Sequence, residues 1–69
     1  MSAGDIHHTI EAVWKIEAPR LIATLARMLR DVGEAEDLAQ DVLLTALERW
    51  PHDGLPDRPG AWLMTTARR

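Results

Sequence analysis

The sequence predicts an all-α protein, a compact bundle of four short helices. Hydrophobic residues make up 46% of the chain, which holds three Trp and no Phe or Tyr, a composition typical of packed helices rather than of a sheet. Apolar residues recur at helical spacing over most of the chain, and the prolines and glycines lie near the ends of these periodic segments or between them. The helices are expected over residues 6–18, 19–31, 34–50 and 58–69.

A chain of 69 residues forms one domain at most. Such a small domain buries only about 60% of the surface that its unfolded chain exposes, so its stability is expected to be marginal. Residues 1–5 are expected to be disordered because they precede the first periodic apolar residue. The helical domain is then expected to cover residues 6–69.

The first half of the chain carries two of the expected helices. Pro19 lacks a backbone N–H and disfavours a helical conformation at Ala18, which predicts a break where Pro19 opens the second helix. One continuous, kinked helix is the alternative. Gly33 is expected to cap the second helix and to form the turn after it. The apolar residues of these two helices are Ile6, Ile10, Val13, Trp14, Leu21, Leu25, Met28, Leu29 and Val32.

The second half carries the other two helices. Pro51 is expected to end the third helix, and residues 51–60 are rich in turn formers and predict a loop. Asp57 is a candidate N-cap of the last helix, with Pro59 in its first turn. The apolar residues expected to pack in these helices are Ala35, Leu38, Ala39, Val42, Leu43, Ala46, Leu47, Trp50, Trp62, Leu63, Met64 and Ala67.

The sequence contains no motif for catalysis or for metal binding. The chain has no cysteine, and its three histidines, His7, His8 and His52, do not have the spacing of zinc ligands. The only serine is Ser2, and the four glycines stand singly, so they form no phosphate-binding loop. We therefore expect no enzymatic activity, no metal or other cofactor and no small-molecule substrate.

The sequence also predicts a cytoplasmic location without membrane contact. No apolar run approaches the roughly 18 residues that a membrane span needs. The N-terminal residues MSAGDIHH have neither the basic start nor the apolar centre of a signal peptide.

The charges are unevenly distributed along the chain. The net charge is −3, from 11 acidic residues against 8 Lys and Arg, which argues against a free-standing DNA-binding protein. The helix macrodipole explains acids such as Glu34 and Glu36 near the start of the third helix. It does not explain Asp41, or why a leucine lies in line with it. A contact with a basic partner helix explains both, and a merely solvated face is the alternative. The residues on this line, called the polar stripe below, are Asp37, Gln40, Asp41, Leu44 and Glu48.

Two sequence motifs resemble those of a known family. AEDLAQDVLL at residues 35–44 closely resembles the AEDLvQevfl signature of bacterial sigma factors, in particular those of the extracytoplasmic-function (ECF) class. RDVG at residues 30–33 is similar to the turn before that signature, and AWLMTTAR at residues 61–68 is similar to the family's aWLxxIARN segment. Residues 50–62 are similar to a subgroup whose full proteins carry an additional C-terminal helical extension. The resemblance covers residues 9–69.

The resemblance implies a sigma factor region 2. In that family this domain binds the clamp helices of the RNA polymerase β′ subunit and takes part in recognising and melting the −10 promoter element, mainly through the non-template single strand. The family's −10 recognition helix continues for further turns, whose residues are expected to follow Arg69. An anti-sigma factor is a further candidate partner. The implied polymerase-binding residues are Asp37, Gln40, Asp41, Leu44, Glu48 and Arg49. The implied DNA-binding residues are His52, Asp53, Arg58, Thr65, Arg68 and Arg69.

Two other functions fit the same helices. A stand-alone helix-turn-helix DNA-binding regulator has a turn such as that at residues 32–33, although an acidic helix after the turn suits DNA poorly. A helical protein-interaction domain without a nucleic-acid function has the same core and the same polar stripe.

Overall fold

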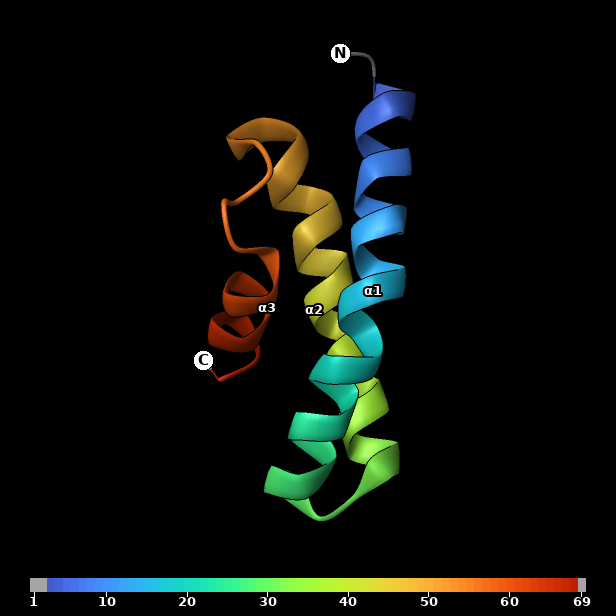
Figure 1. Ribbon diagram of the computed structural model, residues 1–69, viewed down its shortest axis with the longest axis vertical. Helices are drawn as coiled ribbons and strands as arrows, with labels where there is room; N and C mark the ends of the chain where they lie inside the picture. The colour runs from blue at the N-terminus through green and yellow to red at the C-terminus, as the bar shows by residue number, and fades with distance from the viewer. Residues whose placement is uncertain (1–2, 69) are drawn as a thin grey trace.

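The computed structural model describes residues 3–68, which fold into three helices. Helix α1 covers Ala3–Leu29, α2 covers Val32–Asp53 and α3 covers Pro59–Ala67. Helices α1 and α2 form an antiparallel hairpin, and α3 runs back along the hairpin antiparallel to α2 (Figure 1). The predicted all-α class is confirmed, and no strand occurs within the described residues. The predicted number of four helices is wrong.

The two helices expected before residue 32 are a single helix that begins at Ala3 and passes through Pro19. The proline ring costs about 3 kcal/mol inside a helix. However, Ile10 lies before Pro19 and Leu21 and Leu25 lie after it, and all three are buried in the same core. Each buried side chain of this kind contributes about 1.5–3 kcal/mol. Packing of both halves of α1 against α2 therefore outweighs the local preference for a break.

The turn between α1 and α2 lies two residues earlier than expected. Arg30 adopts a positive φ of 56°, and the side chain of Asp31 caps α2 by accepting a hydrogen bond from the Glu34 N–H at 3.0 Å. Such a cap stabilises a helix by about 1 kcal/mol. Gly33 consequently lies inside the first turn of α2, and the prediction that it caps the preceding helix is wrong.

Helix α2 also continues past its predicted end. Pro51 lies within the last turn, and Gly54 closes that turn by donating its N–H to the Trp50 carbonyl at 2.9 Å. The predicted loop of residues 51–60 therefore shrinks to residues 54–58. Helix α3 has Pro59 in its first turn, as predicted, but its N-cap is Arg58 and not Asp57.

The core lies where the three helices meet. The expected apolar face of α2 is confirmed, because five of its residues are buried and three more pack partly buried against them. The buried positions on α2 are mostly alanine, which lets the neighbouring helices approach closely. The buried residues are Ile10, Leu21, Leu25, Ala35, Ala39, Val42, Ala46, Trp50, Leu63 and Ala67.

Three residues expected in the core are exposed instead. Met28, Leu29 and Val32 are 54%, 41% and 61% exposed. They lie at the end of the hairpin where α1 turns into α2, and α3 does not extend to that end (Figure 1). Helical spacing gives the side of a helix on which an apolar residue lies. It does not say whether another element covers that part of the helix.

The tryptophans tie α3 to the hairpin. Trp50 is buried, and its ring meets the half-buried ring of Trp62 edge to face, with centroids 5.2 Å apart and planes at 66°. Such pairs add about 0.5–1.5 kcal/mol to the burial of the rings. The Trp50 indole N–H has no hydrogen-bond partner among the described residues. The expectation that Trp14 and Trp62 belong at least partly to the core is confirmed, since both pack against it.

Candidate functional site

The polar stripe lies on one open side of α2. All five of its residues are exposed. With 3.6 residues per turn they fall within a sector of about 100°, opposite the buried face of the same helix. Leu44, in the middle of the stripe, is 58% exposed. Helix α2 thus has one face committed to the core and an opposite face that binds nothing within residues 3–68.

The electrostatics of the stripe are one-sided. Its three carboxylates, from Asp37, Asp41 and Glu48, form no ion pair within the described part of the chain. Thr45 donates its hydroxyl to the Asp41 main-chain carbonyl at 3.1 Å and leaves the Asp41 carboxylate available. A basic helix laid along α2 would meet acids, an amide and a leucine in succession. That pattern gives both charge complementarity and an apolar contact.

Arg49 lies apart from the stripe, although the family resemblance groups it with the stripe residues as polymerase-binding. It follows Glu48 by one residue, which turns its side chain by about 100° around α2. The structure brings Arg49 into a cavity of about 230 Å³ between α2 and α3. This cavity also contains Thr65, which was predicted to contact DNA. One residue implied in polymerase binding and one implied in DNA binding therefore line the same space.

The remaining predicted DNA-binding residues lie at the end of α2 and at the two ends of α3. His52 and Asp53 lie in the last turn of α2 rather than in a loop, and Arg58 lies just before α3. Arg68 follows α3 at its other end, and all four residues are exposed. Helix α3 has 9 residues, which span about 13 Å along its axis and separate Arg58 from Arg68. Arg69 lies outside the described residues.

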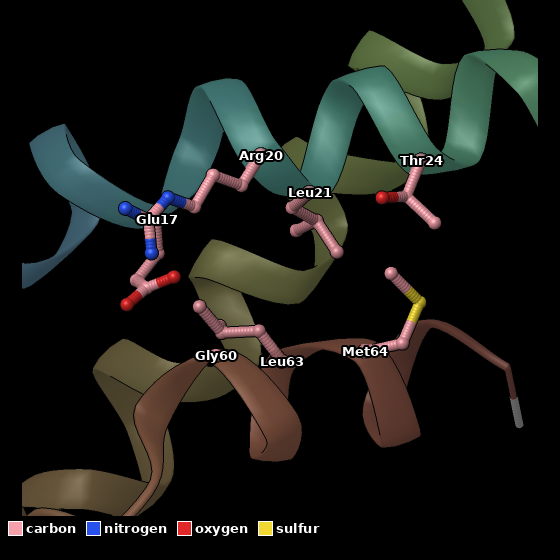
Figure 2. A pocket seen from close by; sticks show the side chains of 7 residues that line it. All are labelled: Glu17, Arg20, Leu21, Thr24, Gly60, Leu63 and Met64. Atoms are coloured by element: carbon pink, nitrogen blue, oxygen red, sulfur yellow. The ribbon is translucent and has the colours of Figure 1, made fainter.

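A second cavity, of about 150 Å³, lies between α1 and α3 (Figure 2). The charged ends of Glu17 and Arg20 gather at one end of it, and Leu21, Leu63 and Met64 supply its apolar part (Figure 2). A Cβ on Gly60 would lie 2.8 Å from a Glu17 carboxylate oxygen. Gly60 therefore allows the Glu17 carboxylate to approach the first turn of α3, where backbone N–H groups favour negative charge.

The cavity between α2 and α3 could not be predicted from the sequence. Thr45 and Arg49 are four residues apart on one helix, and Trp62, Thr65 and Thr66 lie within a turn or so of one another on the next helix. Helical spacing alone predicts each group. That the two groups face each other depends on how α3 packs on α2, and no local signal in the sequence specifies that packing.

The structure adds two observations about the class of protein. No group of His, Cys, Asp and Glu residues within the described chain is arranged to hold a metal ion. None of the helices formed by residues 3–68 combines the length and the apolar character needed to cross a bilayer. The fold is a small all-α domain with two polar surfaces. One is the polar stripe on α2, and the other is the edge formed by α2 and α3.

Comparison with known proteins identifies the family. Residues 14–69 match the family model of Sigma-70 region 2, which is more than half of the chain, and the chain belongs to this family. Sigma-70 region 2 is a non-enzymatic domain of sigma factors, the proteins that act in transcription initiation. This membership argues against the alternative of a stand-alone helix-turn-helix regulator.

A curated relative extends the comparison. An uncharacterized protein of Rhizobium meliloti (strain 1021) is 36% identical over 50 residues, which are 72% of this chain and 12% of that protein. The chain therefore spans only a small part of the length of this relative. No solved structure matches the chain significantly.

Proposed function

We propose that this domain is region 2 of an ECF-class sigma factor. It docks through the polar stripe onto the β′ clamp helices of RNA polymerase in the cytoplasm. It then offers the loop of residues 54–58, the end of α2 and α3 to the non-template strand of the −10 element. In this arrangement the two partners occupy different sides of α2.

The observation that carries the proposal is the exposure of the whole stripe. A 22-residue helix with five buried residues needs only one face for folding. Leu44 is 58% exposed and lies between the exposed residues Gln40, Asp41 and Glu48, so it does not contribute to the buried face of α2. A leucine flanked by acids and an amide suits a coiled-coil surface bearing arginines, where charge sets the partner and the leucine adds buried area. An anti-sigma factor that covered the same stripe would compete with polymerase.

The DNA half of the proposal depends on the polymerase half. The chain carries a net charge of −3, and binding to DNA is driven mainly by cations placed on phosphates. Polymerase core supplies that positive field once the domain is docked. Extruding a base from duplex costs a few kcal/mol, so the isolated domain is expected to bind duplex DNA weakly.

The test is the affinity of the chain for the isolated β′ clamp helices, measured by fluorescence anisotropy. Asp41→Arg combined with Gln40→Ala is expected to weaken binding at least tenfold, because it reverses one charge and removes an amide at the centre of the contact. Both residues are exposed, so circular dichroism should show an unchanged helical fold.

The matched control is Glu11→Arg, which replaces an exposed acid on α1 with arginine, the residue also introduced at position 41. The affinity of this control is expected to stay within about twofold of the wild-type value, because the change in net charge has only a small effect at this distance. If the stripe variant binds as tightly as the wild type, or if the control loses as much affinity, the stripe is not the docking surface. If the wild-type chain does not bind the clamp helices, the result would support the alternative of a helical protein-interaction domain with another partner.

A further inference from the structure

The outer side of α1 carries a surface that the fold does not use. With 3.6 residues per turn, seven exposed residues of α1 fall within a sector of about 140°. This sector lies opposite Ile10, Leu21 and Leu25, the buried side chains of the same helix. The seven residues comprise three bases, one isoleucine and three alanine or proline residues, and none is acidic. They are called the basic face below and are Ala12, Lys15, Ile16, Pro19, Arg20, Ala23 and Arg27.

The charges of the basic face are unpaired. Residues 18–30 contain no acidic residue, and none of the three bases forms an ion pair within the described part of the chain. The charged end of Arg20 lies on the same side as Glu17 (Figure 2), but the two form no ion pair. Ile16 is 62% exposed. An exposed isoleucine among bases has the chemistry of a surface that docks an acidic amphipathic helix.

The polar stripe on α2 has the complementary chemistry. Its three carboxylates form no ion pair within residues 3–68, and Leu44 lies 58% exposed among them. The basic face and the polar stripe each lie opposite the buried side of their own helix, so they cannot meet within one molecule. A second copy of the chain can bring them together.

The spacing of the charges fits an antiparallel contact between α1 of one copy and α2 of the next. With Ile16 set against Leu44, Arg20 and Asp41 lie within about 2 Å of each other along the helix axes. The other two carboxylates of the polar stripe then each lie within about 5 Å of a base along the axes, a distance that Lys and Arg side chains can span. A parallel contact would leave Asp37 about 9 Å from the nearest Lys or Arg.

We infer that the protein self-associates, with the basic face of one copy packed antiparallel on the polar stripe of the next. The contact is heterologous because it joins two different surfaces, so association is expected to continue past the dimer. One pair of helices buries less than about 1,200 Å², which is the size of weak and transient interfaces. Self-association would cover the polar stripe and compete with the β′ clamp helices, and this consequence alone rests on the proposed function.

The first test is sedimentation velocity of the 69-residue chain at low salt. The concentration is raised to about 1 mM, where a contact with a Kd of that size is already half occupied. The mean mass is expected to rise from the 7.8 kDa of the monomer past that of a dimer. It is expected to return to the monomer value in about 1 M salt, which screens charges beyond about 3 Å. A chain that stays monomeric at low salt, or association that resists salt, would overturn the inference.

The second test uses two complementary variants. Asp41→Arg damages the polar stripe and leaves the basic face intact, whereas Arg20→Asp does the reverse. Each variant alone is expected to associate at least about tenfold more weakly than the wild type. Mixing the two is expected to restore association, because the basic face of the first variant meets the intact stripe of the second. If either variant alone associates like the wild type, or if the mixture stays monomeric, the inference is wrong.

The matched control is Glu36→Arg, which makes the same charge change as Asp41→Arg at an exposed position of α2 outside the polar stripe. Its self-association is expected to stay within about twofold of the wild-type value, since exposed charges away from the contact are screened. An equal loss in the control would show that net charge, and not the polar stripe, governs association. Circular dichroism checks that all variants keep the helical fold.

Affinity for the β′ clamp helices is measured on the same variants in dilute solution, so that the two proposals fail separately. Arg20→Asp should leave that affinity unchanged, because its polar stripe is intact. If Arg20→Asp loses clamp affinity and keeps self-association, the basic face contacts polymerase and the inference is wrong. If Asp41→Arg with Gln40→Ala leaves clamp binding intact, the docking proposal is wrong, and the sedimentation measurements still decide self-association.

Discussion

Gly54 ends α2 with a backbone conformation that other residues rarely adopt. Its φ of 87° and ψ of 164° lie in a region that is essentially restricted to glycine. Its N–H closes the last turn on the Trp50 carbonyl, and the loop that leads to α3 starts at this point. A Cβ at this position would find no atom within 4 Å. The requirement for glycine is therefore one of backbone conformation and not of space.

Gly54→Ala is expected to lower the free energy of unfolding by about 1–3 kcal/mol, the cost of holding a non-glycine residue in this region. Urea denaturation followed by tryptophan fluorescence measures the change. Gly4→Ala, in the exposed first turn of α1, is the control and should lose no stability, because alanine favours a helix. Equal stability of the two variants would show that residue 54 does not hold this conformation.

At the scale of elements, α1 is a helix maintained by its neighbours. Its 27 residues run through Pro19, whose ring removes one main-chain hydrogen bond. Pro19 is exposed, so the ring does not fill the core. What keeps the helix continuous is the burial of apolar residues on both sides of it against α2 and α3.

Pro19→Ala is therefore expected to raise the free energy of unfolding by about 1–2 kcal/mol, since the regained helix propensity exceeds the added entropy of the unfolded chain. Thermal unfolding followed by circular dichroism measures this as a higher Tm. Pro56→Ala, in the loop between α2 and α3, is the comparison and should lower stability slightly. A lower Tm for Pro19→Ala would mean that the proline ring itself contributes to packing.

At the scale of the whole molecule, residues that maintain the fold and residues proposed to bind partners are separate. Leu63 anchors α3 in the core with no exposed surface, whereas Leu44 is 58% exposed on the far side of α2. The same side chain thus occupies a structural position on one helix and a surface position on another. A domain of this size has only a few kcal/mol of stability in total.

Leu63→Ala is expected to lower the free energy of unfolding by about 2–5 kcal/mol, through lost burial and the cavity left behind, which leaves much of the chain unfolded. Leu44→Ala is expected to change it by no more than about 0.5 kcal/mol while weakening binding to the β′ clamp helices. Urea denaturation and anisotropy measure the two effects. A large loss of stability in Leu44→Ala would place Leu44 in the fold rather than at the interface.

The sequence by itself determined the helical class, the buried face of α2 and the candidate residues of the polar stripe. These features follow from a helical period of 3.6 residues within one continuous segment. The period can be read without knowing which other segments pack on the helix. An example is the buried face formed by Ala35, Ala39, Val42, Ala46 and Trp50. The family motifs are likewise short continuous segments that can be read from the sequence alone.

Only the tertiary structure decided the number of helices, the exposure of Met28 and Val32, and the position of Arg49. Pro19 continues a helix because side chains distant in sequence are buried together, and Met28 stays exposed because α3 does not reach it. Arg49 faces α3 because of the way that helix packs on α2. Each outcome depends on contacts between segments, whose free energy exceeds local preferences of one to three kcal/mol.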